Sequence, residues 1–300
     1  MPSLAAKTLI LLSGVSSWVL TAPTVTLGAE LLTNPGGPFT FTGDDPDGWT
    51  VIGESGSDPM VSEVATGEAH ADAPTPGGEH CNIYTTGAYI SISQDIATVG
   101  LWYLAEIIID TYTDGALKFE TGVTRVGANI TADKASTFRA ADTNVRVTRS
   151  GSADITVASA SLKRLTSMLS GIDTNRTRQT VRSGLTITDE YQAGVWSDGD
   201  DATTPDNYLL AYYDRLDAKV HLCKYLVDGS FDSEVGSYAA VYSAGATLKI
   251  TPDGNDRIVS YNDVDLVTYT LTDAALIAGT CAGLFSTGNS NAFSTPVAEV

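Results

Sequence analysis

Residues 101–110, LWYLAEIIID, form the most apolar run of this 300-residue chain, and they decide how the neighbouring sequence is interpreted. In the stretches 81–84 and 89–96, apolar and polar residues alternate with a period of two. This alternation is typical of half-buried strands, and a short apolar run beside them is typical of a central strand. The Asp114-Gly115 pair then predicts a hairpin turn after that strand.

The rest of residues 29–165 continues this pattern. Trp49 follows an acidic turn and is predicted to anchor the core. Residues 66–80 contain Pro74, Pro76, Gly77 and Gly78, and they predict a long loop. Near the end, the Ser-Gly-Ser stretch at 150–152 predicts a turn between two closing strands. Strands at a spacing of roughly ten residues, separated by turn signals, indicate a β-sandwich or jelly roll.

Residues 166–183 show little hydrophobic pattern and are predicted to be a linker that joins the second domain as its first strand. Residues 184–300 predict a second sandwich with one short helical turn within 271–278. Its predicted strands are 184–188, 208–214, 219–227, 239–242, 247–252, 257–261, 264–271 and 283–286. The predicted fold class is therefore all-β, with two tandem β-sandwich or jelly-roll domains and an extended N-terminal arm.

The first 28 residues stand outside both predicted domains. Residues 4–20, LAAKTLILLSGVSSWVL, place one base, Lys7, before an apolar run, and residues 27–29 offer a cleavage site, as in a secretory signal. Serine and glycine interrupt the run, which is too short and too polar to span a bilayer. We favour an anchoring arm that docks on another subunit or a larger assembly. A cleaved signal and a strand of the first sandwich are the alternatives.

The net charge of −19 is unevenly distributed along the chain. Residues 1–117 hold fourteen acids and one base, residues 118–184 hold eleven bases and five acids, and residues 185–300 hold seventeen acids and five bases. An acidic surface repels phosphate backbones, so nucleic acid is excluded as an expected partner. The bases of the middle segment are spread along strands without interleaved aromatics, which favours a solvated or partner-facing surface.

The cysteines do not predict a disulfide framework, because there are three of them at wide spacing: Cys81, Cys223 and Cys281. We expect three buried thiols that act as small hydrophobic side chains. His80 adjoins Cys81, and His221 lies two residues before Cys223, but neither pair has the spacing of a zinc site.

Two resemblances follow from longer stretches. The pattern ELLTN, DDPDGWTV, ISISQDIATVGLWYLAEIIID and ADITVASASLKRL, within residues 30–165, resembles carbohydrate-binding-module-like jelly rolls that are common in bacteriophage virion proteins. The runs GVWSDGDDATTPDNYLLAYYD, KVHLCKYLVDGSF, RIVSYNDVDLVTYTL and CAGLFSTGNSNAF, within 194–293, resemble the laminin-G/concanavalin-like sandwich. These resemblances imply fold and leave the ligand open, because such sandwiches serve many functions.

Acidic turns provide candidate calcium sites. Oxygen clusters suit a hard cation that takes six to eight oxygen ligands. The candidate structural calcium ligands lie in two loops and are Asp44, Asp45 and Asp47 in the first, and Asp198, Asp200 and Asp201 in the second. The alternative is that aspartate simply favours turns.

Aromatic residues provide candidate glycan-binding platforms, since sugar recognition uses aromatic faces with a few polar neighbours. Trp102 and Tyr103 are adjacent on one predicted strand, so they point to opposite faces. The candidate glycan-binding residues are Trp102, Tyr103 and Tyr84 in the first domain and Trp196, Tyr208 and Tyr212 in the second. Packing inside the sandwiches is the alternative role for each.

No catalytic motif occurs: the chain has no Gly-x-Ser-x-Gly elbow, no His-Glu-x-x-His and no P-loop, and it lacks the Glu-x-Asp-x-x-Glu strand of concanavalin-like glycosidases. The expected function is a non-enzymatic phage virion structural protein, of the capsid-decoration, head-fibre or tail-fibre type, that displays candidate glycan-binding sandwiches. Its expected partners are other virion proteins, with a homotrimer as the first expectation. A secreted bacterial glycan-binding or adhesion protein is the alternative, and a glycoside hydrolase is the third reading.

Overall fold

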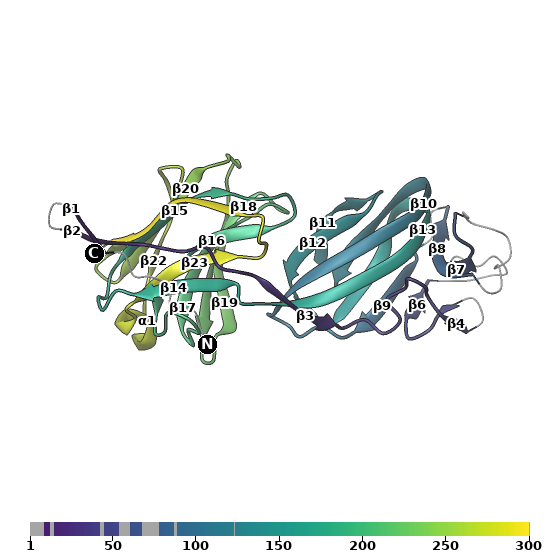
Figure 1. Cartoon of the computed structure of the whole chain (residues 1–300), viewed down its shortest axis with the longest axis horizontal. Helices are drawn as coiled ribbons and strands as arrows, with labels where there is room; N and C mark the ends of the chain where they lie inside the picture. The colour runs from purple at the N-terminus through teal and green to yellow at the C-terminus, as the bar shows by residue number, and fades with distance from the viewer. Residues whose placement is uncertain are drawn as a thin grey trace. The chain divides into compact units, whose positions relative to one another are not determined.

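The structure is a computed structural model of the chain and describes residues 9–12, 15–42, 45–53, 61–67, 78–86, 89–122 and 124–299, with the backbone alone for 9–12, 15 and 16. It is almost entirely β, which confirms the predicted all-β class (Figure 1). The chain divides into two compact units. One consists of Leu27–Leu165, and the other combines the residues up to Thr26 with Thr166–Val300.

The 27–165 unit is built on two long antiparallel strands, β10 (Trp102–Thr121) and β13 (Asn144–Thr166). The first halves and second halves of these strands pair with different neighbours, and all of these pairings belong to one nine-stranded sheet. The other strands are β3 (Thr26–Glu30), β4 (Phe41–Thr42), β5 (Asp45–Pro46), β6 (Thr50–Ile52), β7 (Val61–Val64), β8 (His80–Thr85), β9 (Ser91–Asp95), β11 (Thr124–Ile130) and β12 (Lys134–Arg139).

The two turn signals of this unit do not end strands. Asp114 pairs with Asp154 inside the β10–β13 ladder, and the register shifts on both sides of Asp114 and Gly115. Gly115 has φ +77° and Gly151 has φ +96°, a backbone conformation that glycine adopts without strain. The predicted hairpin at 114–115 and the predicted turn at 150–152 are therefore wrong. Both glycines instead sit at irregular positions inside long strands, where bulges bend a strand without ending it.

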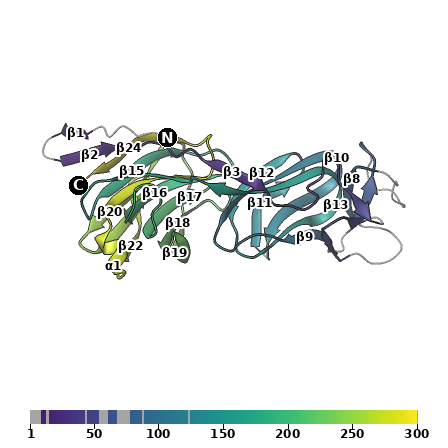
Figure 2. The ribbon, with the colours of Figure 1, turned by 60° about the horizontal axis from the view of Figure 1, so that its bottom comes forward.

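The other unit stacks two antiparallel sheets (Figure 1, Figure 2). The seven-stranded sheet contains, in order, β1 (Leu9–Leu12), β2 (Val15–Val19), β24 (Ala292–Glu299), β15 (Thr180–Thr186), β20 (Ala246–Asp253), β21 (Asp256–Tyr261) and β22 (Val264–Thr270). The six-stranded sheet contains, in order, β14 (Leu169–Asp173), β23 (Cys281–Ser286), β16 (Gln192–Gly199), β17 (Tyr208–Asp214), β18 (Lys219–Leu226) and β19 (Ser230–Ala239). One short helix, α1 (Ala274–Ala278), lies within the predicted helical segment.

The core between these sheets follows from period-two alternation. On β15, Val181 and Leu185 are fully buried, whereas Thr180 and Arg182 point to the other face and are half-buried. Each large apolar side chain removed from water contributes about 1.5–3 kcal/mol of stabilisation. Cys81, Cys223 and Cys281 are free and buried, as expected, and burial raises the pKa of the Cys281 thiol to about 11.

The ends of the predicted domains need correction. The structure pairs Ser17, Trp18 and Val19 with β24, so this part of the predicted arm is a strand of the second sandwich. Residues 166–183 were predicted as a linker, but they contain β14 and the first residues of β15. Only the joining of 180–183 to the second domain as a strand was foreseen. The reason is non-local: these short segments gain their hydrogen bonds from the chain's last strands, which no local pattern reveals.

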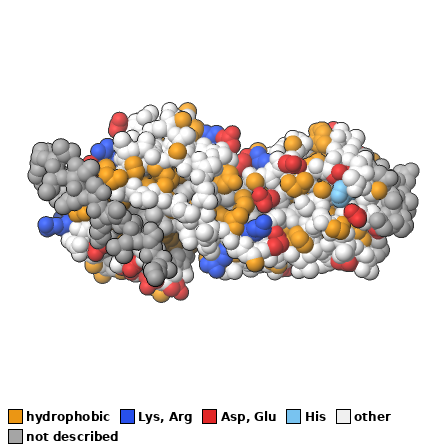
Figure 3. All heavy atoms as spheres, in the orientation of Figure 1, with side chains coloured by type: hydrophobic (Ala, Val, Ile, Leu, Met, Phe, Trp, Pro, Cys, Tyr) orange, Lys and Arg blue, Asp and Glu red, His pale blue; other side chains and the backbone are white. Residues whose placement is uncertain are grey.

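No helix among the described residues is long and apolar enough to cross a membrane. On the face drawn in Figure 3, the acidic and basic side chains of the described residues are interspersed among polar and hydrophobic ones. This distribution suits a solvated surface.

Candidate functional site

Most of the aromatic residues expected to bind glycans are buried. Trp102 is 4% exposed and Tyr103 2%, and the Tyr103 hydroxyl accepts a hydrogen bond from the backbone N–H of Thr98. Tyr84 is half-buried on β8. A ring without a free face cannot stack on a sugar, so in this unit Trp102 and Tyr103 are core residues rather than a platform.

Trp196 on β16 is fully buried because two glycines on other strands leave space for its indole ring. A Cβ atom at Gly171 would lie 2.2 Å from the indole ring, and one at Gly283 would lie 2.6 Å from its Nε1. The indole N–H donates to the carbonyl oxygen of Ser170 at 3.1 Å. The two glycines on neighbouring strands therefore form a slot that holds Trp196 as a structural residue.

Tyr208 and Tyr212 of β17 also lie in packed rows. Tyr208 stacks on Tyr225 with ring centroids 4.5 Å apart, and Tyr212 stacks on His221 at 5.0 Å. Both stacks join directly opposed residues of β17 and β18. Such cross-strand pairs stabilise a sheet. Tyr208 is 6% exposed and Tyr212 3%, so the expected platform in this unit is not formed by these rings either.

The acidic loop after β16 satisfies its carboxylates with protein donors. Asp198 is 1% exposed, and both of its carboxylate oxygens accept hydrogen bonds from the guanidinium of Arg257, which is equally buried. Asp200 accepts from the backbone N–H groups of Asp206 and Asn207 and from the Asn207 side chain. Asp201 accepts from the N–H groups of Thr203 and Thr204 and from the Thr203 hydroxyl. These contacts give the three aspartates a structural role in holding the loop and the core beside it.

The other candidate calcium loop is described only in part. Asp44 lies outside the described residues, and Asp45 belongs to the two-residue strand β5. The Asp47 backbone N–H donates to the Thr40 carbonyl, and its own carbonyl accepts from the Asn34 side chain. These contacts close the turn through the backbone.

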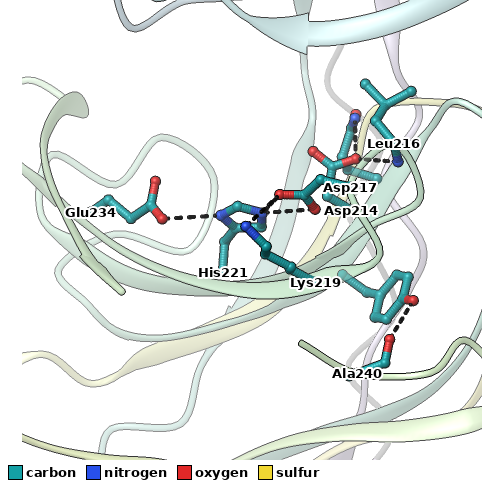
Figure 4. Close-up of polar contacts among 9 residues, drawn as sticks. Asp214, Leu216, Asp217, Lys219, His221, Glu234 and Ala240 are labelled. Carbon is teal, nitrogen blue, oxygen red and sulfur yellow. Dashed lines mark hydrogen bonds and ion pairs between the residues drawn. The ribbon is translucent and has the colours of Figure 1, made fainter. Parts of the chain in front are cut away.

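The structure brings together a different group at the opposite end of β17 (Figure 4). His221 is 9% exposed, and its ring lies between the carboxylates of two neighbours. Its Nδ1 lies 3.2 Å from Glu234 Oε1, and its Nε2 lies 3.1 Å from Asp217 Oδ2. Lys219 Nζ approaches the same Asp217 oxygen at 3.7 Å. Because both ring nitrogens face carboxylates, the arrangement suits a protonated imidazole that donates at both atoms.

The local charges shift the pKa values of this group. Burial lowers the pKa of His221, but the hydrogen bond and charge of Asp217, followed by Glu234, outweigh it and leave that pKa raised. Burial acts to raise the pKa of Asp217, but His221 and then Lys219 leave it lowered. Burial dominates at Asp214 and raises its pKa to about 6, although its Oδ1 accepts hydrogen bonds from the Leu216 N–H and the Gln192 amide.

Asp214, Asp217 and His221 each bring one metal-ligating atom within 4.8 Å of the others. However, both nitrogens of His221 are within hydrogen-bonding distance of carboxylates, and Asp214 Oδ1 accepts two hydrogen bonds. A metal ion would have to displace these partners. The group is therefore described as an ion-pair network rather than a metal site.

Asp217 also lines a pocket of about 660 Å³ at this end of the sandwich, which we call the hairpin-end pocket. The pocket lies where the turn 215–218 faces residues 239–242, at the end of β19 and just after it. Its lining is Tyr213, Arg215, Asp217, Ala218, Ala239, Ala240, Val241 and Tyr242. Val241 is 90% exposed, the largest exposure among the exposed apolar side chains of the described residues.

A cation–π contact, an ion pair and hydrogen bonds hold the walls of the hairpin-end pocket in place. The Arg215 guanidinium lies 3.9 Å from the ring centroid of Tyr242 and pairs with Asp189. The Tyr242 hydroxyl accepts from the Ile187 N–H at 2.7 Å. The Tyr213 hydroxyl donates to the Ala240 carbonyl at 2.8 Å, and burial raises the pKa of Tyr213 to about 12. The pocket thus combines a fixed apolar wall with one cation and one anion at its rim.

Sequence reasoning missed this site. It weighed His221 with Cys223 for zinc and did not connect it with Asp214 or Asp217. The available signal was the segment 212–221, YYDRLDAKVH, where a hairpin places two acids beside a histidine. Glu234, Tyr242 and Val241 reach the site from outside the hairpin, so no spacing pattern could have found them.

No protein-family model matches the sequence, and no curated protein matches it. Among solved structures, the chain is similar to the carbohydrate-binding module CBM66 from Bacillus subtilis (17% identity, TM-score 0.31, 41% of this chain and 72% of that one). It is similar to sheep galectin-11 in complex with glycerol (13% identity, TM-score 0.33, 44% of this chain and 96% of that one). It is also similar to a glycoside hydrolase family 16 endo-glucanase from Bacteroides ovatus (7% identity, TM-score 0.32, 84% of this chain and 92% of that one). Identities and TM-scores this low assign neither a ligand nor an activity.

Proposed function

We propose that this chain is a non-enzymatic glycan-binding protein that takes a sugar unit in the hairpin-end pocket. The observation that carries the proposal is the lining of that pocket. Small-molecule sites combine apolar and aromatic walls with a few fixed polar groups. Here Val241 and Tyr242 supply the apolar wall, and Arg215 and Asp217 supply a donor and an acceptor.

The acceptor is held in the ionised form that hydrogen-bonds sugar hydroxyls. The cation of His221 and the ammonium of Lys219 lower the pKa of Asp217 against the effect of burial. The stacking of Arg215 on Tyr242 fixes the donor without the entropy cost of a free side chain. Preorganised groups of opposite sign favour a neutral polyol over a charged ligand.

The proposal also includes the setting in which the site works. The sequence resemblance to phage jelly rolls supports a virion structural protein that displays the sandwiches on the particle surface, in oligomeric and first of all trimeric form. The alternative setting is a secreted bacterial adhesion protein. Antibody labelling of purified phage particles by electron microscopy separates the two, since a secreted protein leaves the particles unlabelled.

The binding test uses the full chain on a glycan array, followed by titration of the best sugar. In Val241→Asp, a charge enters the pocket at a side chain that is 90% exposed, so the fold stays intact. The matched control is Val227→Asp, at a side chain 74% exposed on a different hairpin turn. We expect Val241→Asp to weaken binding at least about tenfold, since an unpaired charge against an apolar ligand face costs more than about 1.4 kcal/mol.

The control is expected to bind like the parent chain. Equal binding by the parent and Val241→Asp would contradict the assignment of the pocket. No binding to any sugar on the array would contradict the glycan proposal as a whole.

A second candidate function, glycoside hydrolysis, is favoured by one observation. The pKa values of the neighbouring carboxyls Asp214 and Asp217 shift in opposite directions, which is the property of an acid and base pair. Hydrolysis requires both carboxyls to flank the scissile bond. Only Asp217 lines the pocket, while Asp214 binds Leu216 and Gln192, so this candidate ranks second. If the parent chain released reducing sugar and Asp217→Asn did not, glycoside hydrolysis would rank above simple glycan binding.

A further inference from the structure

A second hollow, of about 520 Å³, lies on the outer face of the seven-stranded sheet, and we call it the sheet-face pocket. Its floor comes from β15 and β20, whose side chains on this face are Thr180, Arg182, Thr247, Lys249 and Thr251. Glu299 and Asp263 complete the lining. It shares no lining residue with the hairpin-end pocket.

Two cations oppose each other at the centre of this pocket. Arg182 and Lys249 are direct cross-strand partners in the β15–β20 ladder. Like charges in directly opposed positions destabilise a sheet unless something offsets them. Glu299 offsets one of them, because its Oε1 lies 2.9 Å from the Arg182 guanidinium. Lys249 has no ion-pair partner among the residues that the structure describes, so no direct contact offsets its charge, although Asp263 in the same lining balances the total charge of the pocket.

A hydroxyl in the same pocket also lacks a partner. Thr251 lies two residues after Lys249 and therefore on the same face of β20. Its Oγ1 is buried and has no hydrogen-bond partner in the described structure. A buried polar atom without a partner costs about 1–3 kcal/mol, so such atoms call for an explanation.

We propose that the sheet-face pocket binds a small ligand through one oxyanion group, a carboxylate or a sulfate. The oxyanion lies between Arg182 and Lys249 and accepts a hydrogen bond from the Thr251 hydroxyl. It offsets the like-charge pair and satisfies the unpartnered hydroxyl at once. This inference does not depend on what the hairpin-end pocket binds.

The net charge of the chain does not prevent such binding. A polyanion would interact with the acidic surface along its whole length, which is why nucleic acid is an unsuitable partner. A single oxyanion in this pocket is governed by the charges closest to it, which are the cations Arg182 and Lys249 and the lining carboxylates Glu299 and Asp263. Charges farther away than about 8 Å are largely screened at physiological ionic strength.

The test titrates the full chain with potassium sulfate, sodium glucuronate and glucose, and follows binding by NMR. Sulfate represents a free inorganic anion, glucuronate a sugar-borne carboxylate, and glucose a sugar without an anion. We expect glucuronate to bind, with sulfate competing at the same site, and glucose to leave the pocket resonances unchanged. If only sulfate binds, the site is an oxyanion site for free anions and not for acidic sugars.

Three variants locate the site. Lys249→Gln and Thr251→Val are each expected to weaken glucuronate binding, Lys249→Gln by at least about tenfold, since a charge-assisted hydrogen bond is lost. Arg178→Gln removes the same charge from an exposed position of the same unit and is the matched control. Equal effects of Lys249→Gln and Arg178→Gln, or no oxyanion binding by the parent chain, would overturn the proposal.

Thr251→Val separates a binding role from a folding role. It removes an unpartnered buried hydroxyl and keeps the β-branched shape, so the fold is expected to be at least as stable. Weaker binding in a protein that melts no earlier than the parent would therefore come from the ligand contact itself. Unchanged binding in this variant would contradict the role of Thr251.

Discussion

The two ends of strand β17 both carry clustered aspartates, but the fold uses them in opposite ways. Before the strand, Asp198 is enclosed with Arg257 and Asp200 binds the N–H groups of its own loop. After it, Asp214 and Asp217 face a histidine, and Asp217 reaches an open pocket. The difference shows that acidic turn residues are functional candidates only where the protein leaves an oxygen accessible.

The largest expected effect tests the enclosed end. Asp198→Ala leaves the Arg257 guanidinium buried without its counter-charge, which costs about 3–5 kcal/mol. We expect this loss in the free energy of unfolding of the 166–300 unit, measured by calorimetry of the full chain. Asp253→Ala, at the exposed last residue of β20, is the control. A loss below about 1 kcal/mol, the level of a surface pair, would show that Asp198 is not enclosed as described.

The second prediction concerns pH at the open end. The folded-state pKa of Asp214, about 6, exceeds its ordinary value of 3.8, so its contribution to stability is complete below that value and is lost as pH rises through about 6. The raised pKa of His221 adds a further loss as pH rises above 6.5 through its folded-state value. Stability of this unit is therefore expected to fall as pH rises from about 4 through about 6, and to fall further as pH rises through the raised folded-state pKa of His221.

Asp214→Asn removes the first of these two losses. It keeps the Oδ1 acceptor for Leu216 and Gln192 and has no proton to lose. We expect the variant to gain up to about 3 kcal/mol relative to the parent at neutral pH and to show a flatter profile of melting temperature against pH. A profile parallel to that of the parent would mean that Asp214 is not the titrating group.

The third prediction concerns the loop before β17, which contains Asp200, and its expected loss of stability is smaller. Asp200→Ala removes the acceptor of three hydrogen bonds in the loop 200–207, and we expect a loss of about 1–2 kcal/mol. Because its oxygens already have protein donors, neither added calcium nor a chelator is expected to shift the melting temperature through this loop. A calcium-dependent rise that Asp200→Ala abolishes would support the calcium hypothesis for this end.

The smallest expected effect on stability belongs to the hairpin-end pocket. Val241→Asp changes a side chain that packs little, so we expect a change in unfolding free energy within about 0.5 kcal/mol. The same variant is expected to lose glycan binding. A large loss of stability would mean that Val241 is part of the packing rather than of a ligand surface.

The sequence located many strands closely because their alternation is local. The predicted strands 208–214 and 264–271 correspond to β17 and β22 within one residue at each end. Its list of strands lacks β16, which is buried along its whole length, and β19 and β24, which are half-exposed. It also placed a strand at 239–242, where the structure has the pocket wall, since turn and strand residues look alike there.

By itself, the sequence determined that the chain is all-β and that its cysteines are buried thiols, because period-two alternation and cysteine spacing are properties of short segments. Only the tertiary structure decided which aromatics are enclosed. Trp196 is buried because Gly171 and Gly283, on two other strands, leave room for its ring. The same holds for the site: Asp217, Glu234 and Tyr242 come from different parts of the chain, and their approach depends on sheet pairing that no local pattern encodes.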